Sequence, residues 1–387
     1  MKALCILFML ILLGLNLRPV MATIGPLTDV LLAQWQLGYG WISLLNGIPI
    51  LMMGLGALLG HMLLQYCSAR RLIMLSLILI GAATCWRIFS QSPATMIMSS
   101  LLAGLGIAMV QAFIPAIIKY WWPSRAASYM GIYIPAVMAG AAIAAALAPF
   151  IMQHVSLSWA LGGWGLLAIP ALVLFVLSVP RLPQQQSSTT SPSRLPYNKR
   201  FWQLAIFFGL STSGFTCMLA WLPPYFMDLG HSPTQAGLAL SLLSATEVVA
   251  GLLLTQLAAG SPDRRPWLIL AILFAMSGLF CLAASPAHAW LGVILAGCGV
   301  GALFPLSLIV CMDHLHDSHA SGILTARVQG VGYLIAGIMP MIAGLLRDHL
   351  QTFSTTWGLL AVVFALLLPV AANFNPRHYA RHMPSPG

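Results

Sequence analysis

The sequence predicts an all-α membrane protein of twelve transmembrane helices, arranged as two six-helix bundles. Charged residues make up only 6% of the 387 residues, whereas an average soluble domain has about 25%. Hydrophobic residues make up 60%, which is close to what twelve spans of roughly 20 apolar residues require. One long polar stretch divides the apolar segments into six and six. These observations exclude an ordinary soluble domain.

Apolar stretches bounded by charged or turn residues predict the spans. They cover residues 3–28, 40–65, 72–89, 94–118, 127–152, 159–180, 201–226, 234–259, 267–285, 289–311, 321–346 and 355–374. The first span also resembles a secretory signal ending near Ala22. Because Arg18 interrupts its apolar region, we expect the segment to be retained as a membrane helix.

The positions of Lys and Arg predict the orientation. With a cytoplasmic N-terminus, thirteen of the seventeen basic residues lie on the cytoplasmic side, Arg87 and Arg347 lie at the outer face, and Arg18 and Arg327 lie within spans. The positive-inside rule therefore predicts a protein of the cytoplasmic (inner) membrane with both termini cytoplasmic. We expect the Arg87 side chain to reach the outer interface. Basic residues are scattered singly or in pairs, which argues against nucleic acid as a partner.

Motifs for several common chemistries are missing. The seven cysteines form no C-x-x-C pair, so the sequence encodes neither a disulfide framework nor a zinc site. No nucleotide-binding P-loop or hydrolase motif occurs, and we expect no cofactor. The segment Asp313-His314-Leu315-His316-Asp317-Ser318-His319 has the spacing of no tetrahedral metal site, and we expect a polar loop without metal. A membrane enzyme or receptor that uses this loop stays an alternative of another class.

An internal repeat relates the two halves. Residues 181–200, rich in Ser, Thr, Pro and Gln, predict a cytoplasmic linker between an N-terminal bundle (1–180) and a C-terminal bundle (201–387, with a short cytoplasmic tail). Three sets of residues recur at offsets of 191 to 194: Gly104-x-Gly106 with Gly297-x-Gly299, Gly131 and Pro149 with Gly322 and Pro340, and Arg70-Arg71 with Arg264-Arg265. Two parallel halves form the plan of the major facilitator superfamily, whose substrate site lies between them near mid-bilayer.

Arg18 is the strongest candidate for binding a substrate. It follows Lys2 by sixteen residues, or about 24 Å of helix, which is too deep for its charge to reach water easily. Its planar guanidinium suits a small anion or a carboxylate. The alternative is a structural arginine that binds carbonyl groups freed by Pro19 and Pro26.

Other polar residues within spans complete the candidate site. Arg327 either adds positive potential or extends to the cytoplasmic interface, and Glu247 either carries a proton or pairs with an arginine. The amides bind a ligand or a neighbouring helix, and Trp221, before two prolines that should interrupt its span, lines the site or belongs to an interface belt. The predicted substrate-binding residues are Arg18, Asn46, Gln111, Trp221, Arg327 and Gln329.

Four segments resemble the cyanate transporter family of that superfamily, which includes nitroimidazole-type exporters. They are Gly14-Leu15-Asn16-Leu17-Arg18-Pro19, Ala220-Trp221-Leu222-Pro223-Pro224-Tyr225, Gly301-Ala302-Leu303-Phe304-Pro305-Leu306 and Gln329-Gly330-Val331-Gly332-Tyr333. The resemblance covers essentially the whole chain. It implies alternating access by rocking of the halves, and it carries the family's arginine of the first span onto Arg18.

The gating loops depart from the superfamily motif G-x-x-x-D-R-x-G-R-R. The first copy keeps Gly60 and Ser68-Ala69-Arg70-Arg71 without an acidic residue, whereas the second keeps Asp263-Arg264-Arg265. We expect both to act as cytoplasmic gating loops, although the first lacks the carboxylate of the usual charge relay.

The sequence therefore predicts a secondary active transporter, not an enzyme, for a small anion such as cyanate. The alternative is an exporter of small heterocycles such as nitroimidazoles, which the 20 Met and 12 Trp would accommodate. The predicted partners are a small-molecule substrate, a coupled proton and the lipid bilayer, and we expect a monomer.

Overall fold

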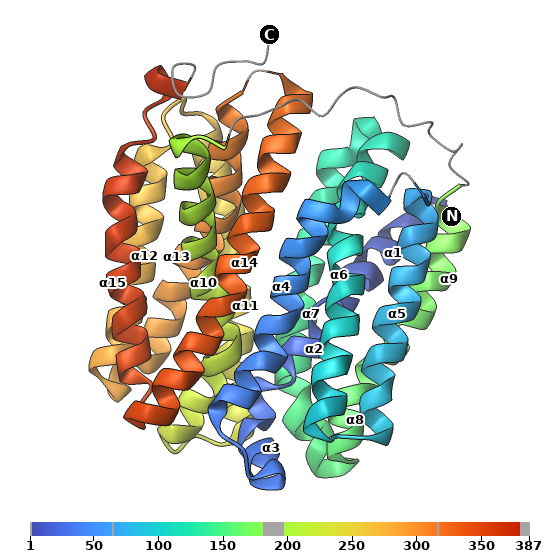
Figure 1. Ribbon diagram of the computed structural model, residues 1–387, viewed down its shortest axis with the longest axis vertical. Helices are drawn as coiled ribbons and strands as arrows, with labels where there is room; N and C mark the ends of the chain where they lie inside the picture. The colour runs from blue at the N-terminus through green and yellow to red at the C-terminus, as the bar shows by residue number, and fades with distance from the viewer. Residues whose placement is uncertain (1, 64–65, 181–196, 316, 380–387) are drawn as a thin grey trace. The chain divides into compact units, whose positions relative to one another are not determined.

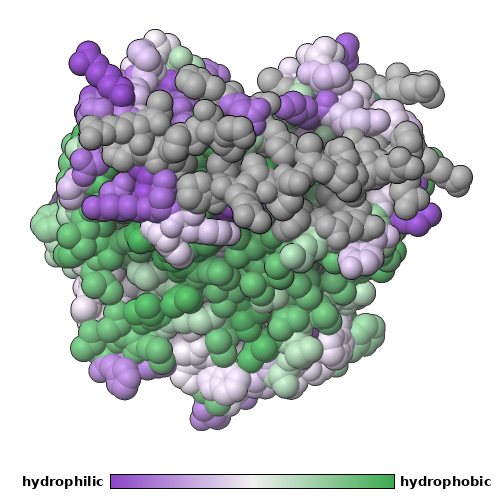
Figure 2. All heavy atoms as spheres, turned by 45° about the horizontal axis from the view of Figure 1, so that its top comes forward, coloured by the Kyte–Doolittle hydropathy of each residue, from purple (hydrophilic) through white to green (hydrophobic). Residues whose placement is uncertain are grey.

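The computed structural model describes residues 2–63, 66–180, 197–315 and 317–379. They are almost entirely helical, and twelve segments are long and apolar enough to cross a membrane, so the predicted number of spans and the all-α class are confirmed (Figure 1). On the face drawn in Figure 2, apolar side chains cover the middle and hydrophilic side chains gather toward the ends. Most of the predicted linker, residues 181–196, lies outside the described residues.

The chain forms two compact units. The first comprises Met1–Ser188 and Leu219–Ser241, and the second comprises Thr189–Met218 and Leu242–Gly387. The first contains α1 (Lys2–Asn16), α2 (Pro19–Ala22), α3 (Thr28–Trp35), α4 (Tyr39–Leu63), α5 (Ala69–Phe89), α6 (Pro93–Trp121), α7 (Ala126–His154), α8 (Leu157–Gly162) and α9 (Ala168–Ser178). The second contains α12 (Arg265–Ala284), α13 (Ala289–Asp313), α14 (Ser318–Leu350) and α15 (Ser354–Ala372). Two helices contribute to both, α10 (Lys199–Asp228) and α11 (Pro233–Ala259).

Helix packing within each unit follows the predicted repeat. A Cβ at Gly106 of α6 would lie 2.8 Å from Ser76 O of α5. The repeat partner of Gly106 is Gly299 of α13, where a Cβ would lie 2.5 Å from Ala271 O of α12. Ala271 follows Ser76 by 195 positions, so the acceptors repeat with the glycines. Both glycines therefore bring the fourth span of a half into backbone contact with the third.

The second face of the same helices repeats as well. A Cβ at Gly104 would lie 2.6 Å from Pro49 Cα of α4. Its repeat partner Gly297 faces Thr246 of α11, and Gly301, one turn later, faces the backbone of Glu247. The glycine run of α13 therefore allows close approach on two faces of one helix.

The first membrane segment is not one continuous helix. It extends from Leu4 to Trp35, but α1 ends at Asn16, α2 begins at Pro19, and a 3-10 turn at Gly25–Leu27 precedes α3. Proline lacks an amide donor, so Pro19 removes the helical bond to Leu15 O and Pro26 removes the bond to Ala22 O. By contrast α10 continues through Pro223 and Pro224 to Asp228, so the interruption that we expected there is wrong.

Packing on α7 holds the N-terminal side of this break. A Cβ at Gly140 would lie 2.6 Å from Leu15 O and 2.9 Å from Leu15 Cα, and one at Gly14 would lie 2.7 Å from Ala136 Cβ. Glycine on each helix therefore allows α1 and α7 to touch backbone to backbone. The carbonyl group freed by Pro19 is covered by this contact.

We expect Gly140→Ala to destabilise the protein by about 1–3 kcal/mol, because the added methyl group collides with backbone that cannot rotate away. Thermal unfolding of the purified protein in detergent measures the effect. Gly131→Ala is the matched control, because Gly131 lies on the same helix and an added Cβ meets nothing within 4 Å. Equal melting temperatures for both variants would contradict the proposed contact.

Candidate functional site

Arg18 lies in the break of the first membrane segment, at the residue before α2. Its side chain is 5% exposed, and its backbone has φ −108° and ψ −23°. The Arg18 carbonyl accepts the amides of Met21 and Ala22 at 3.1 and 3.0 Å, so a new short helix begins at this residue. The guanidinium thus extends from a non-helical piece of backbone within the span. Proteins tolerate such backbone at membrane depth only where other protein groups or water satisfy its hydrogen bonds.

Two buried amides in the first unit keep open hydrogen-bonding capacity. Asn46 of α4 is 0% exposed; its Nδ2 donates to Ile42 O at a long 3.5 Å, and its Oδ1 has no partner among the described residues. Asn16, two residues before Arg18, is 4% exposed and its Nδ2 has no partner there either. We did not predict Asn16, although an amide at the end of an apolar run beside Arg18 was a visible signal. Gln111 of α6 is half-buried.

Trp221 belongs to the first unit. Its side chain is fully buried, and its ring centroid lies 5.8 Å from that of Tyr39. Pro223 packs against Gly25 near the same break, where a Cβ would lie 2.8 Å from Pro223 Cγ. A residue of an interface belt would be exposed to headgroups, so that interpretation is wrong, while a role in binding stays a prediction.

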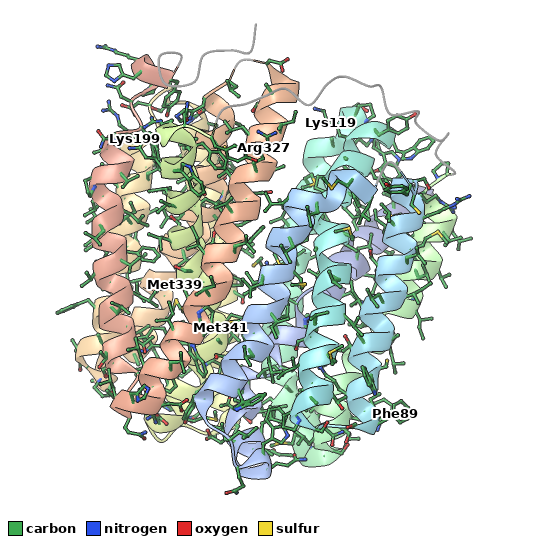
Figure 3. All side chains as sticks on the ribbon, viewed as in Figure 1. Phe89, Lys119, Lys199, Arg327, Met339 and Met341 are labelled. Atoms are coloured by element: carbon green, nitrogen blue, oxygen red, sulfur yellow. The ribbon has the colours of Figure 1, made fainter. Side chains whose placement is uncertain are left out.

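The remaining candidates belong to the second unit. Glu247 is buried on α11, and Gln329 is half-buried on α14. The Arg327 guanidinium lies 5.2 Å from the ring centroid of Tyr197, and Figure 3 shows it near the end of α14 that neighbours Lys199. This position favours extension to the interface. The structure therefore places Arg18, Asn46, Gln111 and Trp221 in one unit and Glu247, Arg327 and Gln329 in the other.

Arg87 is the clearest departure from the sequence analysis. It is 0% exposed, so the expectation that it extends to the outer interface is wrong. Its guanidinium points inward because Ser99, Ser100 and the Val20 carbonyl offer acceptors there. Position near the end of an apolar run did not reveal those acceptors.

The two predicted gating loops use arginine in a parallel way. Arg70 Nε donates to Val179 O at 3.0 Å and its Nη2 donates to Val176 O at 3.1 Å, which are carbonyls at the end of α9. In the second half Arg265 Nη1 donates to Ala372 O at 3.5 Å, at the end of α15. Each arginine thus binds the end of the sixth span of its half. Their gating role stays a prediction.

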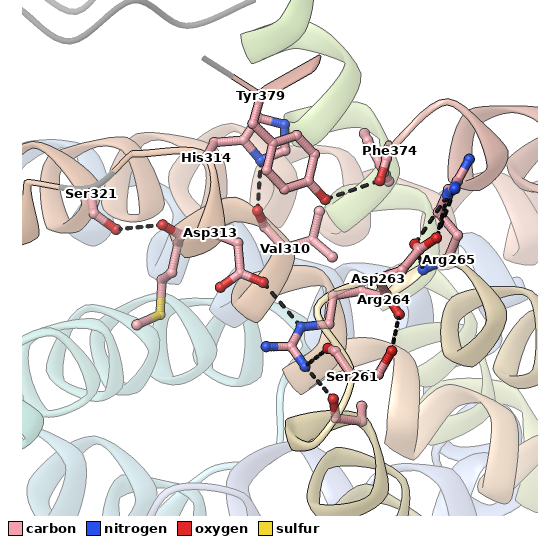
Figure 4. Close-up of polar contacts among 12 residues, drawn as sticks. Ser261, Asp263, Arg264, Arg265, Val310, Asp313, His314, Ser321, Phe374 and Tyr379 are labelled. Atoms are coloured by element: carbon pink, nitrogen blue, oxygen red, sulfur yellow. Dashed lines mark hydrogen bonds and ion pairs between the residues drawn. The ribbon is translucent and has the colours of Figure 1, made fainter. Parts of the chain in front are cut away.

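The second loop adds carboxylates that the first lacks. Asp263 Oδ2 lies 2.7 Å from Arg265 Nη2, and this hydrogen bond holds the pKa of Asp263 below its usual value. Arg264 Nε pairs with Asp313 Oδ2 at 3.0 Å, and Arg264 Nη1 donates to the carbonyls of Ala258 and Ser261. The loop is therefore tied to the end of α13 (Figure 4).

His314 is part of this polar cluster (Figure 4). Its Nδ1 lies 2.6 Å from Val310 O, and because a carbonyl only accepts, its Nε2 accepts from Arg200 Nε at 2.9 Å. The ring stacks on Tyr379, 3.8 Å away, and burial, with the charge of Asp313, raises the pKa of Tyr379 to about 12. The Tyr379 hydroxyl donates to Phe374 O at 3.0 Å. His314 therefore helps to hold the C-terminal segment in place. This structural role gives no support to the alternative of a membrane enzyme or receptor that uses the loop.

Twelve membrane-crossing helices in two repeat-related halves, with a buried arginine at a helix break, define a polytopic membrane transporter. The family model described as Major Facilitator Superfamily matches residues 4–337 and 228–385. The chain belongs to this superfamily and, within it, to the cyanate transporter family. It is accordingly a multi-pass inner membrane protein.

Two relatives and one solved structure illustrate the likeness. The chain is 33% identical over 380 residues to the cyanate transport protein CynX of Escherichia coli (strain K12), covering 96% of this chain and 97% of that protein. It is 27% identical over 379 residues to the 2-nitroimidazole transporter of the same organism, covering 95% and 93%. The crystal structure of a mutant of the nucleoside transporter NupG has a TM-score of 0.75 at 15% identity, covering 95% and 99%, and supports the fold alone.

We expect Arg70→Ala to lower the free energy of unfolding by about 1 kcal/mol, because two helix-terminal carbonyl groups lose a charged donor at a partly exposed site. Chemical or thermal unfolding in detergent measures it. Arg71→Ala is the control, because Arg71 is exposed and its substitution removes the same charge from the same loop. Identical unfolding of the two variants would mean that the bonds to α9 add nothing.

Proposed function

We propose that this protein carries a small monovalent anion, with cyanate as the first candidate, across the cytoplasmic membrane by alternating access. Arg18 contacts the anion in this proposal. The observation that carries it is the place of Arg18, 5% exposed at a break in the first membrane helix. A guanidinium held there offers a fork of N–H donors in a weakly screened environment.

The charge balance of the N-terminal half supports an anion rather than a cation. Residues 1–180 contain seven Lys and Arg but a single acidic residue, Asp29, which is exposed on α3. Arg18 and Arg87 are buried in the span region of this half. Buried positive potential of this kind attracts an anion and repels a cation.

Other residues take part in the proposed transport cycle. In the first unit, Asn16, Asn46, Gln111 and Trp221 contribute to substrate binding. In the second unit, Arg327 and Gln329 are the proposed substrate-binding residues, and Glu247 couples a proton or pairs with an arginine. Arg70, Arg71, Asp263, Arg264 and Arg265 act in cytoplasmic gating loops. Both termini are cytoplasmic, and the protein works as a monomer.

A second candidate function is the export of small nitroaromatic heterocycles. The name of the 2-nitroimidazole transporter, to which the chain is 27% identical, favours it. The half-buried ring of Tyr39, which packs beside the buried ring of Trp221, is a surface on which such a heterocycle would stack.

We expect Arg18→Lys to lower the rate of labelled cyanate uptake into proteoliposomes at least about tenfold, because lysine keeps the charge but loses the planar fork of donors. Arg125→Lys, an exposed change of the same kind outside the proposed site and gating loops, should leave uptake within about twofold of the natural protein. Unaltered uptake by the Arg18→Lys variant, at equal amounts of inserted protein, would rule out the proposed anion contact.

The substrate and the coupling ion are tested in the same vesicles. Cyanate uptake that increases when the outside is made more acidic, and that loses this increase in Glu247→Gln, is expected if Glu247 carries the proton. Accumulation of 2-nitroimidazole without any cyanate flux would favour the second candidate function instead.

A further inference from the structure

Arg87 of α5 binds three neutral groups while fully enclosed. Its Nε donates to Ser99 Oγ at 2.7 Å and its Nη2 donates to Ser100 Oγ at 2.8 Å, both on α6. Its Nη1 donates to Val20 O at 2.8 Å. Ser99 Oγ in turn donates to Ala83 O at 2.7 Å, which fixes the hydroxyl as an acceptor for Arg87. All three nitrogen atoms are thus oriented by the protein.

The carbonyl that Arg87 binds is one that the helix break has left open. In an uninterrupted helix Ile24 N would donate to Val20 O, but here it donates to Met21 O at 3.1 Å. Val20 is 1% exposed, so water does not replace the missing donor. Arg87 therefore supplies the hydrogen bond that the backbone lacks two residues after Arg18.

This contact changes what the break presents to a solute. In interrupted membrane helices, unwound carbonyl oxygens commonly coordinate a cation. At this break the open carbonyl oxygen is occupied by a guanidinium, whose partners carry no charge to offset its own. The break is therefore more positive than the same backbone without Arg87.

We propose that Arg87 is a positioning residue for Arg18: it fixes the segment that carries Arg18 and makes the break selective for anions. This inference rests on the proposed function, because it concerns the same site. It assigns Arg87 no contact with the solute, since its Nη1 binds Val20 O and its other nitrogen atoms bind α6.

The geometry requires arginine at this position. Ser99, Ser100 and Val20 lie in three directions around one planar group, which matches a guanidinium. Lysine in its place keeps the charge but reaches fewer of the three acceptors at once, whereas glutamine keeps a donor and loses the charge. Ser100→Ala removes one support and leaves the charge unchanged. The three variants therefore separate charge from orientation.

The experiment measures KM and maximal rate for labelled cyanate in proteoliposomes of the full-length protein. We expect KM to increase about tenfold in Arg87→Lys, about a hundredfold in Arg87→Gln and about threefold in Ser100→Ala, with maximal rates within about twofold of the natural protein. Ser76→Ala is the matched control, because Ser76 lies buried on α5 and its hydroxyl donates to Leu72 O of its own helix. Its KM should not change.

A second measurement needs no substrate. Hydrogen–deuterium exchange followed by mass spectrometry should show faster exchange over residues 17–25 in Arg87→Lys than in Ser76→Ala, with residues 100–118 unchanged. Exchange that stays unaltered in Arg87→Lys overturns the inference. If the natural protein takes up no cyanate but the exchange difference is present, the proposed function fails while the role of Arg87 in fixing the segment stands.

The kinetic measurements also distinguish a positioning role of Arg87 from a general packing defect. A fall in maximal rate at unchanged KM in Arg87→Lys would overturn the inference, because a general packing defect acts in that way. If Arg87→Gln does not insert into the membrane, Ser100→Ala decides: an unchanged KM in that variant overturns the inference, and the expected increase supports it.

Discussion

The break of the first membrane helix at Arg18 and Pro19 is the constraint on which the candidate site depends. Proline and the short helix after it leave carbonyl groups without helical donors, and apolar surroundings make such groups costly. One of them, Val20 O, accepts a hydrogen bond from Arg87, and another, Leu15 O, lies against Gly140 of α7. The segment that carries Arg18 is thereby fastened to α5 and α7, with α6 supporting it through Arg87.

The two halves share their packing but not their charges. Gly104 and Gly106 contact the second and third spans of the first half, and Gly297 and Gly299 make the corresponding contacts in the second. The buried acid Glu247, in contrast, has no buried acidic counterpart in the first half, where the single acidic residue, Asp29, is exposed. Helix geometry determines the backbone packing, and the repeat preserves that geometry in both halves. Binding a solute requires only a few side chains, and these can lie on one half.

The charged loops follow the same principle. Arg70 binds carbonyl groups at the end of α9, where the first loop has no carboxylate, and Arg265 combines a similar bond with Asp263. The first loop lacks an acidic residue, but it is still bound to the last helix of its half, because helix-terminal carbonyl groups also accept hydrogen bonds from a guanidinium.

The sequence by itself determined the number of spans, the two-part repeat and the family, because apolar length and glycine spacing are local features that the membrane fold must satisfy. It also indicated Arg18, since a charge at that depth is conspicuous. Only the tertiary structure decided that Arg87 turns inward, that Trp221 is enclosed and that Asn16 is buried with an open donor among the described residues. An arginine near a span end looks the same in sequence whether it reaches outward or inward, and the difference lies in acceptors that other helices supply.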